Sequence, residues 1–468
     1  MRRLAAGVLL PGFLGTALPE PVAAWLAEGV AGVTLFGENV QDLRQVRALT
    51  DAVRAVRPEA VVAIDEEGGD VTRLHMAAGS PEPGNGVLGR LDDLALTAAS
   101  ARAIGLELVA AGVQLDLAPT VDANTNADNP VIGARSFGAD PGLVARHAAA
   151  WVEGLQSTGV AACAKHFPGH GDTALDSHLG LPVVDQPVAV LEERELVPFR
   201  AAIAAGVAAV MTSHILLPRL DPGAPATMSR PILTGLLRER LGFTGVVVTD
   251  ALDMRGASAG IGIPEAAVRA LVAGADLLCL GKASEPHVGP VLDAITAAVE
   301  AGALPLGRLR EAAGRIAALS RPAAASLSAA PRPEAARLAA AFDVQPAATE
   351  ALARTGPWTV VRIDAEPNIA VGTTGWGPFA ATSDDPTNGG VFAGWPRVDL
   401  AADGDGEVPE VAGRALVIGR DIHRHAHARA TVDRLRATVP TVVVDMGWPS
   451  EDRRYADVAQ PLRHPRRD

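Results

Sequence analysis

The chain has 468 residues, which is room for two or three domains, or for one large barrel and something smaller. Apolar residues make up 48% and charged residues 20%, so the chain can bury a large core, and the composition excludes a disordered protein. The 54 acidic and 41 basic residues give a net charge of −13, which argues against nucleic acid or an anionic membrane as a partner.

The N-terminal segment, MRRLAAGVLLPGF, has two arginines before an apolar stretch, as a signal peptide does. Pro11 and Gly12 interrupt that stretch, and Gly7–Leu10 has the composition of a first strand, so we expect a cytoplasmic protein. No apolar run reaches the roughly 20 residues that span a bilayer. Cys163 and Cys279 lie in apolar runs and are expected to be buried thiols.

Eight short apolar runs recur through the first 280 residues, with stretches of helical composition between them. Such alternation is typical of a parallel sheet, and eight units in this length match a (β/α)8 TIM barrel. The glycine fingerprint of a Rossmann fold is absent after the first run. The runs are Gly7–Leu10, Gly32–Phe36, Val61–Ile64, Val113–Ala118, Ala161–Ala164, Ala208–Met211, Gly245–Thr249 and Ala275–Leu280. The helical stretches include Asp42–Ala55, Leu94–Gly105, Leu143–Thr158, Glu192–Ala205, Pro231–Leu241 and Pro264–Ala273.

Polar residues follow the third and fourth runs. Asp65 ends the third run, and its carboxylate suits bidentate acceptance from sugar hydroxyls. Arg73 can pair with Asp65 or orient a ligand oxygen, and Gly68 and Gly69 would let the backbone approach a ligand. Arg135 lies near the end of the Asn- and Asp-rich loop after the fourth run, whose asparagines can satisfy loop backbone.

The segment after the fifth run, KHFPGHGDTALDSHLGLP, concentrates ionisable side chains in one predicted loop. Its Pro and Gly residues disfavour a helix, which argues against His166 and His170 as a helical metal-binding pair, although a metal site stays open. Asp176 and His178 are spaced to pair, and a carboxylate on one imidazole nitrogen raises the basicity of the other. His178 is therefore a candidate general acid/base.

The sixth and seventh runs each end near a candidate residue. His214 follows the sixth run, and Asp250 ends the seventh. A carboxylate at the end of a buried strand can serve as nucleophile, base or metal ligand, or it can cap the next helix, a role that Asp253 could take instead. In a barrel most of these strand-end residues would ring the C-terminal mouth, where active sites lie.

The character of the sequence changes after about Leu319. We predict a TIM-barrel catalytic domain over residues 1–320, a linker or helical junction over 321–350, and a small α/β domain over 351–468. In the last region TVVRID, RALVIG and TVVVDMG are strand-like, and Ala426–Thr438 has a helical pattern. Thr373–Pro396 is expected to be loop, and the tail Arg463–Asp468 to be disordered.

At this point the segments KHFPGHGDTALDSH, VVVTDALDM, AIDEEGGDVTR, APTVDANTNADNPVIGARSFG and VMTSHI together resemble glycoside hydrolase family 3. The DSH form of the loop is similar to the bacterial β-N-acetylglucosaminidase branch, which acts on cell-wall recycling fragments. The resemblance covers about residues 5–320. It implies Asp250 as the nucleophile that forms a covalent glycosyl-enzyme, and His178 as the acid/base with Asp176 as its partner.

The resemblance further implies a binding set for a terminal N-acetylglucosamine. This set is Asp65, Arg73, Arg135, Lys165 and His166, with His214 and Met254 lining the same pocket. Asp70 and Glu38 depart from the family pattern, because basic residues are expected at both positions, and the added negative charge puts the accepted aglycone in doubt. Residues 351–468 are then expected to be structural or interfacial.

The first hypothesis is therefore a retaining exo-β-N-acetylglucosaminidase (a β-N-acetylhexosaminidase) acting on small cell-wall-derived glycosides. Alternatives are a phosphorylase on the same scaffold, since a neutral imidazole would not repel phosphate, and a β-glucosidase or β-xylosidase of the family. A barrel that binds without turnover and a metal-dependent hydrolase are further alternatives. No cofactor or metal motif is present, and the expected partner is a small glycoside, with neither nucleic acid nor membrane.

Overall fold

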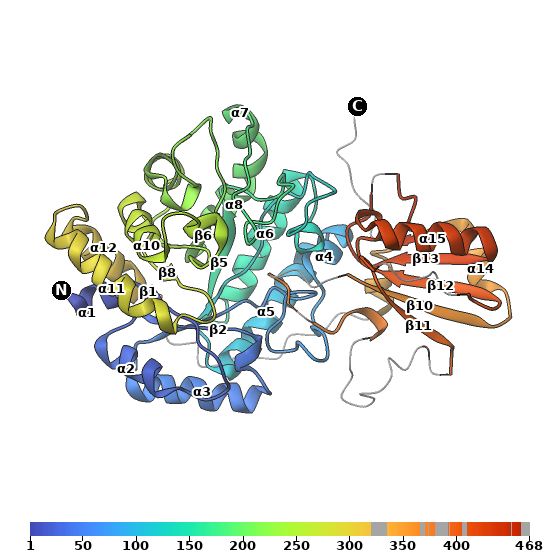
Figure 1. Cartoon of the computed structure of the whole chain (residues 1–468), viewed down its shortest axis with the longest axis horizontal. Coiled ribbons are helices and arrows are strands. Elements are labelled where there is room, and N and C mark those ends of the chain that lie inside the picture. The colour runs from blue at the N-terminus through green and yellow to red at the C-terminus, as the bar shows by residue number, and fades with distance from the viewer. Residues whose placement is uncertain are drawn as a thin grey trace.

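The computed structural model describes residues 1–319, 335–365, 370–372, 374–379, 392, 394–404, 410–450 and 452–459. We call residues 1–319 the N-terminal unit and the described residues from 335 to 459 the C-terminal unit. The two units lie side by side along the long axis of the molecule (Figure 1). The predicted tail Arg463–Asp468 and most of the predicted linker lie outside the described residues.

The N-terminal unit contains eight short strands, one at each predicted apolar run. Strands β2 to β7 form a six-stranded parallel sheet in chain order, and β1 pairs with β8. Isolated parallel bridges join Gly12 to Thr34 and Val248 to Leu277, which link the two sheets at both edges. The strands are β1 (Leu9–Leu10), β2 (Gly32–Leu35), β3 (Val61–Ile64), β4 (Leu115–Asp116), β5 (Ala161–Phe167), β6 (Ala209–Thr212), β7 (Val246–Val248) and β8 (Leu278–Cys279).

Helices follow most of these strands, close to the predicted stretches. The helix at Leu43–Val56 begins where the Asp42 side chain accepts a hydrogen bond from the Gln45 amide at 2.8 Å, as an N-cap does. The predicted stretch Pro231–Leu241 is a π-helical segment, Pro231–Arg240. The helices are α1 (Arg2–Ala6), α2 (Glu20–Glu28), α3 (Leu43–Val56), α4 (Asn85–Leu91), α5 (Leu94–Ala111), α6 (Pro141–Gln156), α7 (Val188–Val190), α8 (Leu196–Ala204), α9 (Arg255–Ser258), α10 (Ile263–Ala273), α11 (Glu285–Glu300) and α12 (Leu306–Ala317).

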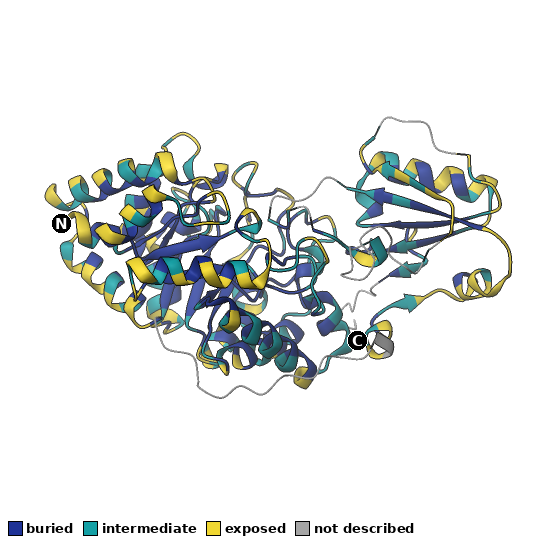
Figure 2. Ribbon diagram, turned by 90° about the horizontal axis from the view of Figure 1, so that it is seen from below, coloured by how far each residue is buried: buried dark blue, intermediate teal, exposed yellow. Residues whose placement is uncertain are grey.

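The strands are buried inside a layer of helices that expose one side to solvent (Figure 2). Among the described residues, α5 is the helix whose length and composition would suffice to cross a membrane. It packs against α3 and α6, and eight of its 18 residues are buried in the core. A helix packed in the core of a globular protein can have the same length and apolar composition, so packing explains the composition of α5.

The C-terminal unit is built on a second sheet, in the order β11-β10-β12-β13-β14-β9, in which the pairing of β14 with β9 is antiparallel and the others are parallel. Alternate residues of its central strands face two separate apolar clusters, one under α15 and one beside α14, as expected for a sheet covered on both faces. Its elements are α13 (Ala335–Ala339), β9 (Asp343–Val344), α14 (Pro346–Ala353), β10 (Trp358–Asp364), β11 (Arg397–Ala401), β12 (Arg414–Gly419), α15 (Ala426–Thr438), β13 (Thr441–Asp445) and β14 (Val458–Ala459).

The prediction of an α/β fold with parallel sheets is confirmed. Strands β10, β12 and β13 and helix α15 lie where the sequence placed them. Several features were not predicted, among them the following three. Helix α1 precedes the first strand, the edge strand β11 follows the predicted loop Thr373–Pro396, and the second sheet begins at β9, inside the predicted junction 321–350 rather than at residue 351. Within that loop, residues 373, 380–391 and 393 lie outside the described residues.

Candidate active site

A cavity of about 820 Å3 lies where the carboxyl ends of the strands of the N-terminal unit meet, and we call it the mouth cavity. Its size falls in the range of small-molecule sites. Eight of the ten candidate residues line it, and the structure therefore brings together segments that are far apart in the sequence. The candidates that line it are Asp65, Arg73, Arg135, Lys165, His166, His178, Asp250 and Met254.

Asp250 follows the last residues of β7 and is half-buried in the mouth cavity. The Ala251 amide donates a hydrogen bond to its Oδ1 at 2.8 Å. Burial by itself raises the pKa of the Asp250 carboxyl, but neighbouring imidazoles and this amide outweigh the effect and hold the pKa below its ordinary value. The carboxylate is thus ionised at neutral pH, as a nucleophile or base requires.

His178 and Asp176 form the predicted pair on the loop after β5. Nδ1 of His178 lies 2.7 Å from Oδ1 of Asp176, and the His178 amide donates to the same oxygen at 2.8 Å. Burial by itself lowers the pKa of His178, but the hydrogen bond to Asp176 and the negative charge of Asp250 raise it above its ordinary value. Because Nδ1 is engaged by a carboxylate, Nε2 is the atom available for proton exchange.

The loop that carries this pair is held by close backbone packing and by a buried histidine. Ring nitrogens of His170 lie 2.6 Å from Thr173 Oγ1 and 3.1 Å from Ser177 Oγ, and burial lowers the pKa of His170 to about 4. A Cβ on Gly171 would come within 1.8 Å of the Ala123 carbonyl oxygen, so only glycine allows this approach. His170 therefore positions the loop and stays uncharged at neutral pH.

The base of the mouth cavity is a buried network of charges. Lys165 Nζ lies 2.7 Å from both Asp65 Oδ1 and Glu67 Oε1. Arg135 donates from Nε and one terminal nitrogen to the two oxygens of Glu67, at 3.0 and 2.7 Å. Burial by itself would raise the pKa of Glu67, but the two cations hold it far below its ordinary value. Burial by itself lowers the pKa of Lys165, but Asp65 and Glu67 raise it above its ordinary value, so the ammonium group stays charged at the base of the mouth cavity.

Two further histidines complete the surroundings. His166 follows Lys165, and its Nδ1 lies 2.8 Å from Oδ2 of the buried Asp122, which orients the ring. His214 is fully buried and, contrary to the prediction, does not line the mouth cavity. It contacts the lining residue Ala251, whose carbonyl oxygen accepts a hydrogen bond from Nε2 of His214 at 3.0 Å. Burial lowers the pKa of His214, and its hydrogen bond ties the ring to the residue that follows Asp250.

The C-terminal unit reaches into the mouth cavity. Arg73 donates to the carbonyl oxygens of Val371 and Ala370 at 2.7 and 2.6 Å, and the Gly375 amide donates to the Met76 carbonyl oxygen at 2.7 Å. Residues 370–372, which we call the strap, thereby form one wall of the cavity. Arg73 also lies 3.8 Å from Asp65, the pairing that the sequence suggested.

Comparison with known proteins identifies the family of the chain. Residues 16–319 match the family described as "Glycosyl hydrolase family 3 N terminal domain". The chain belongs to glycosyl hydrolase family 3. The resemblance and the class of enzyme predicted from the sequence, a glycoside hydrolase, are thus confirmed.

Curated and solved members of family 3 resemble the chain over different lengths. A beta-hexosaminidase A of Pseudoalteromonas piscicida is 39% identical over 285 residues, and the match spans 56% of this chain and 48% of that protein. A beta-hexosaminidase of Chromobacterium violaceum is 38% identical over 59% of this chain and 78% of its own. The solved family 3 beta-N-acetylglucosaminidase of a Paenibacillus species has a TM-score of 0.83 and 30% identity, and it covers 99% of this chain and 94% of its own.

The two departures from the family 3 pattern are each offset by a distant cation. Asp70 lies 2.8 Å from Arg420 of the C-terminal unit, and Glu38 lies 2.7 Å from Lys282. The added negative charges are therefore neutralised where they stand. In the same segment a Cβ on Gly69 would meet Gly84 at 2.5 Å, so glycine at this position allows close packing of the two backbone segments.

Sequence reasoning placed Glu67 and Asp122 after strand ends but gave them no role, and it missed the strap. The two acids were visible next to predicted strand ends, but their partners Arg135, Lys165 and His166 could not be assigned without distances. No signal identified the strap, which contacts Arg73 across almost 300 positions of sequence. Among the described residues, no group of three or more His, Cys, Asp and Glu side chains is placed to hold a metal ion, and both cysteines are buried and unpaired.

Proposed function

We propose that this protein is a retaining exo-β-N-acetylglucosaminidase, with Asp250 as nucleophile and His178, paired with Asp176, as acid/base. The observation that carries the proposal is the placing of an ionised carboxylate and a carboxylate-bonded imidazole in one cavity. The names of the related beta-hexosaminidases and of the Paenibacillus structure support N-acetylglucosamine as the sugar.

The reaction proceeds in two steps with overall retention. In the first step an Asp250 oxygen attacks the anomeric carbon while Nε2 of His178 gives its proton to the departing glycosidic oxygen, which leaves a glycosyl ester on Asp250. In the second step Nε2 takes a proton from water, the water oxygen attacks the same carbon, and Asp250 leaves as a carboxylate. Asp176 holds the imidazole orientation and stabilises the imidazolium form.

The sugar is held by the network at the base of the mouth cavity. Asp65 accepts hydrogen bonds from sugar hydroxyls, and Lys165 and His166 donate to them. Arg135 and Arg73 stand beside these groups, with Met254 at the wall. Because Arg73 also binds the strap, we infer that closure of this side of the sugar site depends on the C-terminal unit.

The closed barrel, the natural substrates, the cellular location and the division into domains are part of the same proposal. The bridges between the two sheets of the N-terminal unit support a closed (β/α)8 barrel over residues 1–320. Small glycosides released from the cell wall remain the proposed substrates, and the cytoplasm the proposed location. A second domain after a junction also remains proposed, but it begins by β9 (Asp343–Val344), inside the predicted junction 321–350.

The test is release of the aglycone from an aryl β-N-acetylglucosaminide, with and without inorganic phosphate, followed by identification of the sugar product. The proposal expects free N-acetylglucosamine under both conditions. Sugar 1-phosphate formed with phosphate would favour the phosphorylase, which the imidazole acid/base allows because it does not repel phosphate as a carboxylate would. Faster release from the matched aryl β-glucoside or β-xyloside would contradict the assigned sugar.

A further inference from the structure

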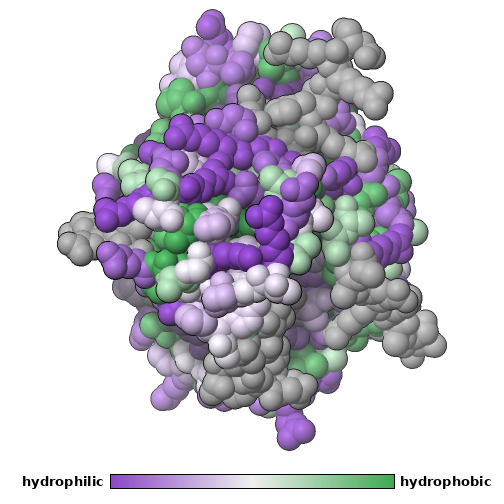
Figure 3. Space-filling model, turned by 90° about the vertical axis from the view of Figure 1, so that its right-hand side faces the viewer, coloured by the Kyte–Doolittle hydropathy of each residue, from purple (hydrophilic) through white to green (hydrophobic). Residues whose placement is uncertain are grey.

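The loop that carries His178 is long and is held only in part by apolar packing. Residues 168–187, which we call the acid/base loop, connect β5 to α7 without a helix or strand of their own, apart from a bridge at Val183. Large apolar side chains of this loop lie on the surface, with Leu175 42%, Leu179 61% and Val183 58% exposed. By comparison, hydrophilic residues cover much of the described surface at the end that the C-terminal unit forms (Figure 3). Exposed apolar side chains add little burial energy, so polar contacts must fix His178.

Asp172 is the point at which the acid/base loop is joined to its surroundings. Its Oδ2 accepts hydrogen bonds from Arg194 at 2.9 Å and from Gln186 at 3.2 Å. Its Oδ1 accepts one from the Thr125 hydroxyl at 3.2 Å. Thr125 comes from the loop after β4, and Gln186 from the far end of the acid/base loop. Arg194 lies in the π-helical segment Leu191–Glu195, which precedes α8. One carboxylate therefore ties three segments together.

Arg194 is the charged donor of this junction, and a second carboxylate holds it in place. Its Nε donates to Oε1 of the buried Glu195 at 2.6 Å. Burial by itself lowers the pKa of Arg194, but Glu195 and Asp172 raise it above its ordinary value. A hydrogen bond between two charged groups is about twice as strong as one between neutral groups. The bond from Arg194 is therefore the strongest of the three that Asp172 accepts.

Glu195 also packs against the start of the acid/base loop. Gly169 has a φ of +135°, and a Cβ there would come within 2.6 Å of Oε2 and 2.7 Å of Cβ of Glu195. The π-helical segment thus contacts the loop twice before the chain reaches His178. Burial raises the pKa of Glu195 to about 7, although Arg194 opposes the rise. The carboxyl can therefore take up a proton if Arg194 is replaced, and such a variant should still fold.

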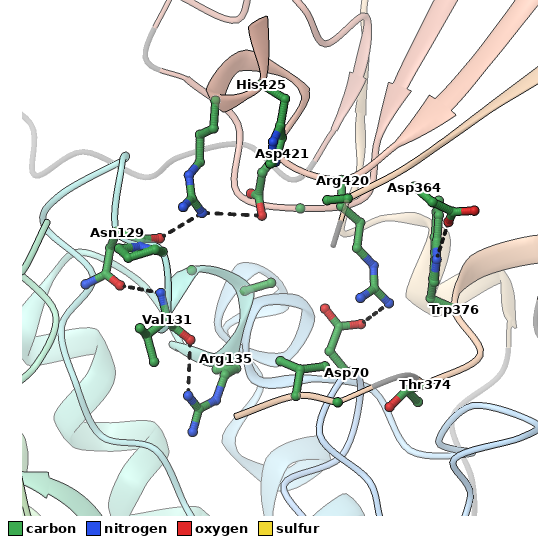
Figure 4. Close-up of a pocket in the computed structure, with 18 of the residues that line it drawn as sticks. Asp70, Asn129, Val131, Arg135, Asp364, Thr374, Trp376, Arg420, Asp421 and His425 are labelled. Atoms are coloured by element: carbon green, nitrogen blue, oxygen red, sulfur yellow. Dashed lines mark hydrogen bonds and ion pairs between the residues drawn. The ribbon is translucent and has the colours of Figure 1, made fainter. Parts of the chain in front are cut away.

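A run of hydrogen bonds leads from this anchored part of the loop to His178. The carbonyl oxygen of His170 accepts a hydrogen bond from the Asn129 side chain at 2.8 Å. Asn129 is fixed in turn, because its Oδ1 accepts from the Val131 amide at 2.9 Å, and the two groups face each other (Figure 4). Nε2 of His170 lies 3.1 Å from Oγ of Ser177, the neighbour of His178. A shift near Asp172 would therefore be passed on to the acid/base.

We propose that Arg194 is a positioning residue for acid catalysis, which holds the acid/base loop through Asp172 so that Nε2 of His178 reaches the departing oxygen. The inference rests on the proposed function, in which His178 gives that proton. Proton transfer requires heavy atoms within about 2.6–3.2 Å, and a misplacement of about 1 Å can cost about 10²-fold in rate. Arg194 does not line the mouth cavity, so its effect reaches the reaction through the loop.

The test compares two aryl β-N-acetylglucosaminides that differ in their need for an acid. Dinitrophenolate leaves without a proton, whereas phenoxide requires the proton of His178 as it leaves. The variants Arg194→Gln and Asp172→Asn each remove the charged contact with little change in size. The matched control is Arg219→Gln, because Arg219 pairs with Asp185 of the same loop at 2.7 Å and both side chains are more than half exposed. The readout is the ratio of kcat/KM for the phenyl glycoside to kcat/KM for the dinitrophenyl glycoside.

Both variants of the anchoring pair are expected to lower this ratio about tenfold or more, while the dinitrophenyl glycoside is still hydrolysed. The control should leave the ratio unchanged. The double variant should lower it no further than either single one, because all three lack the same contact. Arg194→Lys keeps the charge but not the fork that reaches both carboxylates, so its ratio should lie between those of Arg194→Gln and the unaltered protein.

Two results would overturn the role of Arg194. One is an unchanged ratio in both variants, and the other is an equal fall for the two glycosides in variants whose circular dichroism is unaltered, as a merely structural role would give. The proposed function has its own test, in His178→Ala. Normal hydrolysis of the phenyl glycoside by that variant, or hydrolysis of neither glycoside by the unaltered protein, would overturn the proposed function itself.

Discussion

Replacement of Glu67 by glutamine should destabilise the N-terminal unit strongly. The Glu67 side chain is 2% exposed and pairs with Lys165 at 2.7 Å and with both forks of Arg135 at 3.0 and 2.7 Å. The glutamine has the same size but no charge, so two buried cations would lose their shared counter-ion. Removing one partner of a buried pair costs about 3–5 kcal/mol. Asp65 remains beside Lys165, and we therefore expect about 3 kcal/mol.

The assay is equilibrium unfolding in urea, followed by tryptophan fluorescence. The matched control is Glu265→Gln, since Glu265 pairs with Arg269 on the surface, where both side chains are about half exposed. Such a pair contributes about 0–1 kcal/mol. A cost for Glu67→Gln that does not exceed that of the control would refute the argument that this network holds the site.

The effect of Glu67→Gln should also depend on pH. The folded-state pKa of Glu67 lies below its ordinary value of 4.5, so its contribution to stability is present above that pH. The contribution is lost as the pH falls through the folded-state pKa. The difference in stability between the unaltered protein and the variant should therefore shrink in acid, and unfolding curves measured at neutral and at low pH check this sign.

Two further predictions concern the loop after β5. Asp176→Asn removes the negative charge that helps to raise the pKa of His178, so the alkaline limb of the kcat/KM profile should move to lower pH and kcat should fall by about 10²-fold; an alkaline limb that stays in place would contradict the assigned pair. Gly171→Ala forces a Cβ against the Ala123 carbonyl oxygen, so it should displace the loop and lower activity. An unchanged circular dichroism spectrum would show that the variant is still folded and that the loss is local. Full activity in this variant would show that the loop is not held as described.

The sequence predicted the elements whose signals are local. Short apolar runs marked each of the eight strands, and the spacing of Asp176 and His178 was enough to predict their pairing. Strand β11 was missed because its residues alternate between exposed and half-buried, as expected for an edge strand with little apolar surface. The π-helical segment Pro231–Arg240 was predicted in place, since its amphipathic pattern does not depend on its exact hydrogen bonding.

Contacts between distant segments could not be predicted. Asp70 was expected to add negative charge near the site, but its partner Arg420 lies 350 positions away in the C-terminal unit. Arg73 was expected at the sugar, and its two bonds to the strap were not foreseen for the same reason. Neither pairing has a spacing or composition that marks it, because each depends on how the two units dock.

The most direct test of the central claim is mass spectrometry of the protein after reaction with a slow, activated fluoro-sugar analogue of N-acetylglucosamine, followed by peptide mapping. The account predicts one added sugar per chain, carried by the peptide that contains Asp250. A turnover-competent protein that never carries the sugar, or that carries it on another residue, would contradict the assignment of Asp250 as the nucleophile.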